Sequence, residues 1–284
     1  MSAALQGLPR TVLRLHRTAL LVWTATVTAL TGWLVWLNEV TARSVMDSLA
    51  RCRGTDLCRD VFAGFGYSEP TGWIGTLVCH SFLAVAAFAG GALIGRELES
   101  GTARLAWTQG VTPTRWLTAK LALPALAVTA GGTVLTLMYR WGWGAHRPLM
   151  DDHWSTGDVF VARGPLTVAY GLCALAVGTL AALLLRRALA ALGAAVGTMW
   201  LVNLLLTQCR ADLWPALTRT SPKPVTLPAG AWQVTRGRNA GGDFAVYHPA
   251  SHFWPLHLVE TGVVLALTML VTTAAFLVLR RRAA

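Results

Sequence analysis

The sequence has few charged residues and almost no lysine. Of its 284 residues 13% are charged, against about 25% in a soluble domain. Lysine occurs only at Lys120 and Lys223, so the 24 basic residues are nearly all arginine. This low charge, together with 54% hydrophobic residues, excludes an ordinary soluble protein and places the chain in the membrane class.

Several motifs of enzymes and nucleotide-binding sites are also missing. The chain has no GxxxxGK[ST] phosphate-binding loop, no HExxH, no GxSxG and no CxxC. ATP hydrolysis, zinc proteolysis, serine hydrolysis and thiol redox chemistry therefore lack their sequence signatures. We expect no catalytic residue, no metal site and no cofactor in this chain.

The net charge of +11 does not indicate a nucleic-acid-binding protein. Basic residues lie at the ends of apolar runs and form no compact patch, so we expect no nucleic acid partner. His248, His252 and His257 lack an accompanying Cys or carboxylate cluster, and prolines between them break any shared helical face. The three histidines therefore do not predict a metal site.

Six apolar runs are long enough to cross a bilayer. Each has about 20 residues, which spans the hydrocarbon core as a helix, because backbone groups in lipid must be paired within their own segment. We predict an all-α integral membrane fold in one domain, residues 1–284, that begins with a basic amphipathic segment at 1–18. The predicted spans are about 19–37, 73–94, 116–139, 165–185, 189–206 and 256–279.

The distribution of basic residues predicts which side of the membrane the termini occupy. Total counts of Lys and Arg tie between the two sides, but on the side of the termini these residues crowd into short segments next to the spans. Arg186–Arg187 and Arg280–Arg282 are the clearest examples. Because density near span ends sets orientation, we expect an N-in/C-in topology. The outer loop 207–255 is rich in aromatic residues and proline, and we expect it to pack into a small cap.

Three polar residues lie in the outer parts of the predicted spans. His80, Asn203 and Glu260 fall at similar depth, and ionisable groups in lipid are costly enough to suggest a role. One interpretation is the polar lining of a substrate path or outer gate. The other is that His80 bonds a hydroxyl group and Glu260 lies at the wet interface.

Two further features each leave two interpretations open. Cys52 and Cys58 lie in an outer polar loop, where they form either a disulfide or two free thiols. The pairs Gly91-x-x-x-Gly95 and Gly193-x-x-x-Gly197 permit close helix approach, either within the chain or between two chains.

The 95–120 stretch is the long polar interruption on the cytoplasmic side. Gly110 is suited to end a helix over Ser100–Gln109, and Thr112-Pro113 is suited to begin the next one. A short amphipathic piece between two spans cannot form a pore. It fits either a docking surface for a soluble partner or an ordinary polar loop.

The same stretch contains Glu97, then the pair Gly101-Thr102, then the basic residues Arg115 and Lys120. This order resembles the first cytoplasmic loop of ABC-2 type transporter permeases. Further runs are similar to an actinobacterial subgroup of that family, and Leu15-His16-Arg17 stands where the subgroup often has Gln-His-Arg. These runs are Trp107-Thr108-Gln109, Arg115-Trp116-Leu117 and the 247–260 segment YHPASHFWPLHLVE.

The resemblance implies a type V exporter-like transmembrane domain in a bacterial plasma membrane. Its partners would be a second permease chain, identical or related, and ATP-binding cassette subunits that hold ATP and Mg. Segment 1–18 would be the elbow helix and 95–115 the coupling loop. The family's apolar-rich piece after Gly-Thr is here Ala103–Trp107, which departs from the pattern. The coupling contacts implied or adjoining are Glu97, Glu99, Gly101, Thr102, Arg104 and Trp107.

The function implied is that of a permease subunit of an ATP-driven exporter, which moves a hydrophobic or amphipathic substrate outward. Since the chain lacks a phosphate-binding loop, any energy from ATP must enter through another polypeptide. The alternative is a non-transporting membrane sensor or anchor whose cytoplasmic loop docks a soluble partner. An intramembrane enzyme ranks third.

Overall fold

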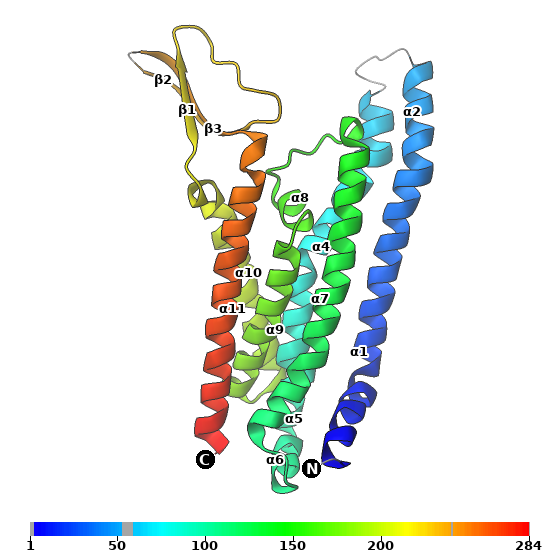
Figure 1. The fold of residues 1–284 in the computed structure, drawn as a ribbon, viewed down its shortest axis with the longest axis vertical. Coiled ribbons are helices and arrows are strands. Elements are labelled where there is room, and N and C mark those ends of the chain that lie inside the picture. The colour runs from blue at the N-terminus through cyan, green and yellow to red at the C-terminus, as the bar shows by residue number, and fades with distance from the viewer. Residues whose placement is uncertain (1–2, 53–58, 240, 284) are drawn as a thin grey trace.

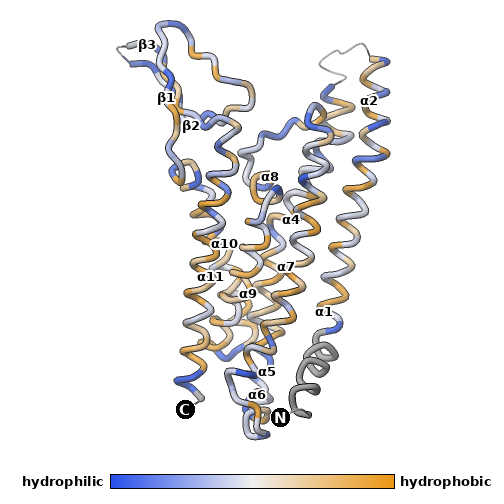
Figure 2. Tube along the Cα trace, viewed as in Figure 1, coloured by the Kyte–Doolittle hydropathy of each residue, from blue (hydrophilic) through white to orange (hydrophobic). Residues whose placement is uncertain are grey.

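The computed structural model is a long helical bundle with a small β-sheet at one end (Figure 1). It describes residues 3–52, 59–239 and 241–283, with side chains from residue 17. Both termini lie at the end opposite the sheet, so we name the two ends the terminal end and the sheet end. Hydrophobic residues dominate the length between these ends, and polar residues gather at both (Figure 2).

Within the described residues, six helical stretches are long and apolar enough to cross a membrane, which confirms the predicted number. Most of these helical stretches are longer than the corresponding apolar runs in the sequence, because several helices continue past the hydrophobic residues through turns that contain polar residues. The stretches are Arg17–Arg51, Arg59–Glu99, Pro113–Ala145, Leu166–Leu185, Ala188–Leu213 and Ala250–Arg282.

The first two spans extend far toward the sheet end, through residues that lie between the predicted spans 19–37 and 73–94. The buried Tyr67 hydroxyl donates to Asn38 Oδ1 at 2.9 Å, and Asn38 Nδ2 donates to the Leu34 carbonyl at 2.8 Å. This polar pair ties the two extensions together. Their elements are α1 (Ala3–Trp36), a π-helical segment η1 (Leu37–Thr41), α2 (Ala42–Arg51), a π-helical segment η2 (Arg59–Ser68), α4 (Glu69–Ala87) and a π-helical segment η3 (Phe88–Gly95).

The return at the terminal end consists of two short helices, α5 (Arg96–Glu99) and α6 (Thr102–Thr108). Gly110 has φ +89°, and Thr112 is extended with ψ 143° immediately before α7 (Pro113–Ala145). The predicted helix end and helix start are therefore confirmed. The helix that we expected over Ser100–Gln109 is shorter, because Gly101 with φ +76° separates α5 from α6.

Helix α9 (Leu166–Leu185) forms the centre of the bundle, and most of its side chains are buried. Arg186 then takes a left-handed conformation with φ 55°, which allows α10 (Ala188–Cys209) to start almost at once. Arg282, in the last turn of α11 (Phe253–Ala283), donates to the carbonyls of Leu183 and Leu184. A basic residue of the last helix thus binds the exposed carbonyl end of α9.

The 207–255 loop contains a three-stranded antiparallel sheet, which the sequence analysis did not predict. Its strand order is β1-β3-β2. Trp154 packs edge-on against Trp232 at 5.9 Å and donates from Nε1 to the Gly230 carbonyl at 2.6 Å, so the sheet rests on the segment after α7. The elements are η4 (Arg147–Leu149), α8 (Gly157–Ala162), η5 (Arg210–Leu213), β1 (Leu217–Ser221), β2 (Trp232–Asn239), β3 (Gly242–His248) and η6 (Ala250–His252).

Candidate functional site

At the terminal end, Glu97 fixes the α5–α6 return to α7. Lys120 Nζ donates to Glu97 Oε1, and Trp116 Nε1 donates to Glu97 Oε2 at 3.2 Å. The side chains of Lys120 and Glu97 are only 6% and 17% exposed. A half-buried carboxylate with two such partners is held in one position. Glu97 therefore fastens the α5–α6 return to α7 and exposes little surface to another protein.

Glu99 makes a second internal connection. Its Oε2 accepts a hydrogen bond from the backbone nitrogen of Ala188 at 3.0 Å. Ala188 is the first residue of α10, whose unpaired backbone N–H groups carry partial positive charge. The α5–α6 return is therefore fastened to α7 by one carboxylate and to the start of α10 by the other.

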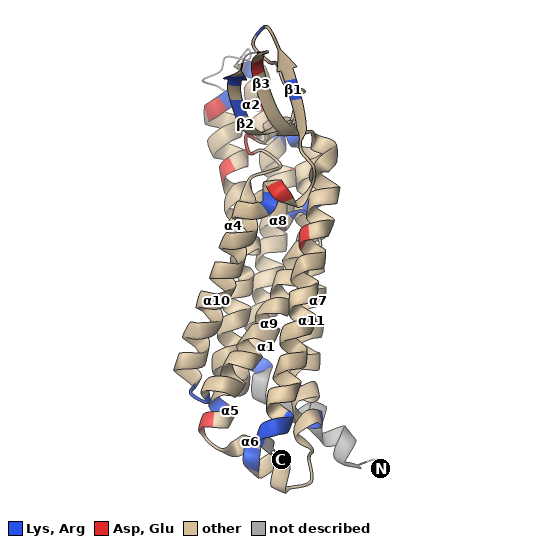
Figure 3. Cartoon of the chain, turned by 90° about the vertical axis from the view of Figure 1, so that its left-hand side faces the viewer, with Lys and Arg blue, Asp and Glu red and all other residues tan. Residues whose placement is uncertain are grey.

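Helix α6 buries one face and exposes the other. Ala103 is 1% exposed, and the Trp107 ring meets Trp116 edge-on at 5.8 Å. Leu105 is 59% exposed, and Arg104 beside it is also exposed. Figure 3 shows this end of the bundle with its basic and acidic residues close to the two short helices.

The structure separates the six predicted coupling residues into two groups. Glu97, Glu99 and Trp107 are engaged within the chain, and Gly101 supplies the left-handed turn. Thr102 and Arg104 are exposed; Thr102 Oγ1 is 3.4 Å from the Glu97 carbonyl. Sequence reasoning missed Leu105, although an apolar residue beside Arg104 on a short polar helix was a usable signal.

At the sheet end, Glu260 forms a fully buried ion pair with Arg210. Arg210 Nε donates to Glu260 Oε2 at 2.7 Å and Nη2 donates to Oε1 at 3.1 Å. The two side chains are 2% and 0% exposed. The Tyr170 hydroxyl also donates to Oε1, at 3.1 Å, and the guanidinium carbon lies 4.2 Å from the Phe160 ring centroid.

This ion pair corrects the interpretation that Glu260 lies at a wet interface. A lone carboxylate in a span needs a partner, and Arg210 at the end of the preceding span provides it. Asn203 interacts with Tyr170 and so belongs to the same network. His80 does not, because its ring faces Trp200 at 5.7 Å and its Nδ1 is 3.0 Å from the Thr76 carbonyl.

The three histidines of the last segment have separate contacts. His248 and His252 place their Nδ1 atoms 3.1 Å apart, while His248 Nε2 lies 3.0 Å from the Ala211 carbonyl. Burial, with the neighbouring His252 as a smaller cause, lowers the pKa of His248. His257 Nε2 accepts from the backbone nitrogen of Leu166 at 3.2 Å.

Two other sets of residues bear on the predicted sites. Cys79, His80 and Asp158 have ligand atoms within 4.8 Å of one another, an arrangement that three residues of a metal site can have. The thiol is buried and the His80 ring already bonds a carbonyl, so we assign no ion there. Cys52 is disulfide-bonded, and Cys58 lies outside the described residues.

The two glycine pairs differ in their surroundings. A Cβ atom on Gly91 would lie 3.2 Å from the Leu192 side chain, and one on Gly95 would lie 2.9 Å from Ala188. Within the described residues, nothing lies within 4 Å of a Cβ atom on Gly193 or Gly197. The first pair therefore packs against α10 inside the chain, and the second lies on an open face of α10.

The ABC-2 membrane transporter related family model matches residues 24–210, which is more than half of the chain. The protein belongs to this family. No curated protein and no solved structure matches it. Membership, with the six apolar helices, makes the protein a multi-pass transporter permease. The matched range includes the α5–α6 return and Arg210, but not the sheet or α11.

Proposed function

We propose that this protein is the membrane subunit of an ATP-driven exporter and moves a hydrophobic or amphipathic substrate outward. A separate ATP-binding cassette subunit hydrolyses ATP and docks on the exposed face of α6. The observation that carries this proposal is the braced return, in which Glu97 and Glu99 hold α5 and α6 to two spans while Leu105 stays 59% exposed. A helix that is held rigidly against two spans can transmit a movement of the docked subunit to those spans, whereas a flexible loop would not.

The docking proposal is tested by co-purification with a candidate ATP-binding cassette protein, to be sought first among the products of neighbouring genes. Leu105→Ser removes an exposed apolar side chain, so we expect affinity to fall about tenfold, the usual size of a well-placed contact. Leu217→Ser is the matched control, because Leu217 is an exposed apolar residue on β1 at the opposite, sheet end of the molecule. Equal retention of the partner by both variants would contradict docking on α6.

The co-purified complex also separates export from the alternative function. If the partner docks but its ATPase rate is independent of the permease, a sensor or anchor role is favoured. We expect instead that the permease changes the ATPase rate, and that Leu105→Ser removes this change in proportion to the lost binding.

The proposed direction of transport requires the terminal end to face the cytoplasm. The Arg186–Arg187 turn and the Arg280–Arg282 end support this orientation through their density of positive charge. An impermeant thiol reagent applied to whole cells provides the test. Lys223→Cys in the outer loop should react and Arg187→Cys should not; the reverse pattern would invert the topology.

The proposed complex contains a second permease chain, placed against the open face of α10. Gly193 and Gly197 lie on this face, with Leu201 and Leu204 exposed further along it. Small residues let two helices approach closely in lipid. Gly197→Cys, in a Cys209→Ser background that removes an exposed thiol, should form a disulfide-linked dimer under mild oxidation. Thr272→Cys on α11 is the control.

A further inference from the structure

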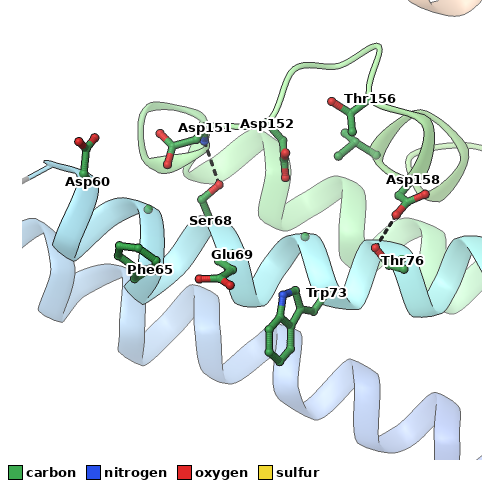
Figure 4. A pocket seen from close by; sticks show the side chains of 13 residues that line it. Asp60, Phe65, Ser68, Glu69, Trp73, Thr76, Asp151, Asp152, Thr156 and Asp158 are labelled. Carbon is green, nitrogen blue, oxygen red and sulfur yellow. Dashed lines mark hydrogen bonds between the residues drawn. The ribbon is translucent and has the colours of Figure 1, made fainter.

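A cavity of about 640 Å³ opens near the sheet end, between α4, η2 and the segment from Asp151 to Val159. Its volume falls within the range of small-molecule sites, which is about 300–1,000 Å³. Figure 4 shows the labelled side chains that surround it. The lining residues are Asp60, Gly64, Phe65, Ser68, Glu69, Gly72, Trp73, Thr76, Asp151, Asp152, Thr156, Asp158 and Val159.

The cavity concentrates negative charge in a protein whose net charge is +11. Its lining includes five carboxylates and no basic residue, and none of the five forms an ion pair with a described residue. Burial, followed by the charges of Asp151 and Asp158, raises the pKa of Asp152. Arg147 opposes this change only in part, and its Nη1 bonds the backbone carbonyls of Met150 and Asp152.

Glycine residues of the neighbouring helices leave room for these carboxylates. A Cβ atom on Gly64 would lie 3.0 Å from Asp151 Oδ2, and one on Gly72 would lie 3.1 Å from Asp152 Oδ2. The Ser68 hydroxyl accepts a hydrogen bond from the Asp151 backbone at 2.9 Å, which fixes the start of the acidic segment. The carboxylates are thus placed directly over helix backbone, where an ordinary side chain would crowd them.

Two aromatic side chains complete the cavity. Phe65 and Trp73 are 68% and 61% exposed, so two aromatic rings are open to a ligand.

We infer that this cavity binds an organic cation with apolar groups, such as a lipophilic amine or a quaternary cation, and that this is the class of cargo. The inference rests on the proposed export function. Carboxylates attract the charge, and aromatic faces bind cations as well as apolar groups. A bare divalent ion fits less well, because no three of the five carboxylates form a metal-ligand cluster within the described residues.

The direct test measures the binding of an organic cation to the purified permease, in the absence of ATP and of the ATP-binding subunit. Tetraphenylphosphonium and tetraphenylborate have nearly the same shape and opposite charge. We expect the phosphonium to bind and the borate not to compete for its site. Phosphonium affinity should fall at least tenfold in Asp152→Asn and Asp158→Asn, and stay unchanged in Asp243→Asn, which alters a carboxylate on the sheet. Equal binding by the Asn variants, or displacement by the borate, would overturn the inference.

A steric variant keeps the test independent of charge substitutions. Gly72→Ala places a methyl group 3.1 Å from Asp152 Oδ2 and should weaken phosphonium binding. Gly144→Ala is the matched control, because no atom of the described residues lies within 4 Å of a Cβ atom on Gly144. Lowering the pH should also weaken phosphonium binding, because the raised pKa of Asp152 makes this carboxylate lose its charge at a higher pH than an ordinary aspartate does. The charged groups that face Asp152 are Asp151 and Asp158, which raise its pKa, and Arg147, which lowers it.

The cargo claim and the export proposal fail in different ways. If the ATP-binding subunit does not dock, the export proposal fails while phosphonium binding to the isolated chain still decides the cavity. If the complete complex hydrolyses ATP but phosphonium is neither transported nor alters the rate, the cargo claim is overturned and the docking proposal stands.

Discussion

The two ends of the bundle each contain a carboxylate paired with a basic residue, but the pairs differ in burial. Glu97 and Lys120 at the terminal end are 17% and 6% exposed, whereas Glu260 and Arg210 at the sheet end are 0% and 2% exposed. The first pair lies under a short helix with an open face. The second lies inside the bundle, between a tyrosine hydroxyl and a phenyl ring.

This comparison shows that the same chemistry serves two purposes. A buried charge pair gains little net stability, but breaking it leaves a charge without water or a partner. The sheet-end pair therefore locks α11 to the end of α10. The terminal-end pair lies close to water, so its loss costs less stability and mainly frees the α5–α6 return.

The largest effect is expected from breaking the sheet-end pair. Arg210→Met leaves the Glu260 carboxylate buried and unpaired, which should cost about 3–5 kcal/mol of folding free energy. We expect little monodisperse protein in detergent and a large fall in the unfolding temperature of what remains. A variant as stable as wild type would show that the pair is not buried in the folded protein.

The double variant Arg210→Met with Glu260→Gln sharpens this prediction. It removes both charges and keeps an acceptor for the Tyr170 hydroxyl, so most of the lost stability should return. The readout is the unfolding temperature measured beside that of Arg210→Met. A double variant that is less stable than the single one would mean that the charges act separately.

A smaller effect on stability is expected at the terminal end. Lys120→Met should cost about 1–2 kcal/mol, because Glu97 keeps its bond from Trp116 and is partly reached by water. We expect a large fall in the partner's ATPase rate in the complex, even though the free energy of unfolding changes only by this small amount. Unchanged ATPase coupling in a folded Lys120→Met protein would contradict the bracing role of this pair.

The smallest effect is expected from Glu99→Gln. The exposed Glu99 carboxylate at the start of α10 should contribute about 0.5 kcal/mol, as is usual for a charge at a helix N-terminus. High salt should reduce the difference between this variant and wild type. Salt should not reduce the effect of Arg210→Met, because that pair is shielded from the solvent.

The sequence predicted features that depend on local signals. Long apolar runs specified the spans, and Gly110 with Thr112-Pro113 located the end of the α5–α6 return and the start of α7. It did not reveal that Arg210 pairs with Glu260, because the two lie 50 residues apart and only helix packing joins them. The acidic cavity was missed for the same reason, since Asp152 reaches Gly72 only in the folded bundle.

The sheet in the 207–255 loop shows a different limit of sequence-based prediction. Its strands are short, and most of their side chains are exposed or half-buried, so they lack the alternation that identifies a strand. Aromatic content correctly suggested that the loop packs. The contact that positions it, Trp154 on Trp232, joins residues from two separate loops.

The central claim is that the exposed face of α6 passes ATP energy into the spans. The most direct measurement is the ATPase rate of the partner subunit reconstituted in lipid nanodiscs with wild-type permease, Leu105→Ser or Leu217→Ser. At a limiting permease concentration, we predict that the permease-dependent part of the rate falls about tenfold with Leu105→Ser and is retained with Leu217→Ser. Equal rates for the two variants at this limiting concentration would contradict the claim.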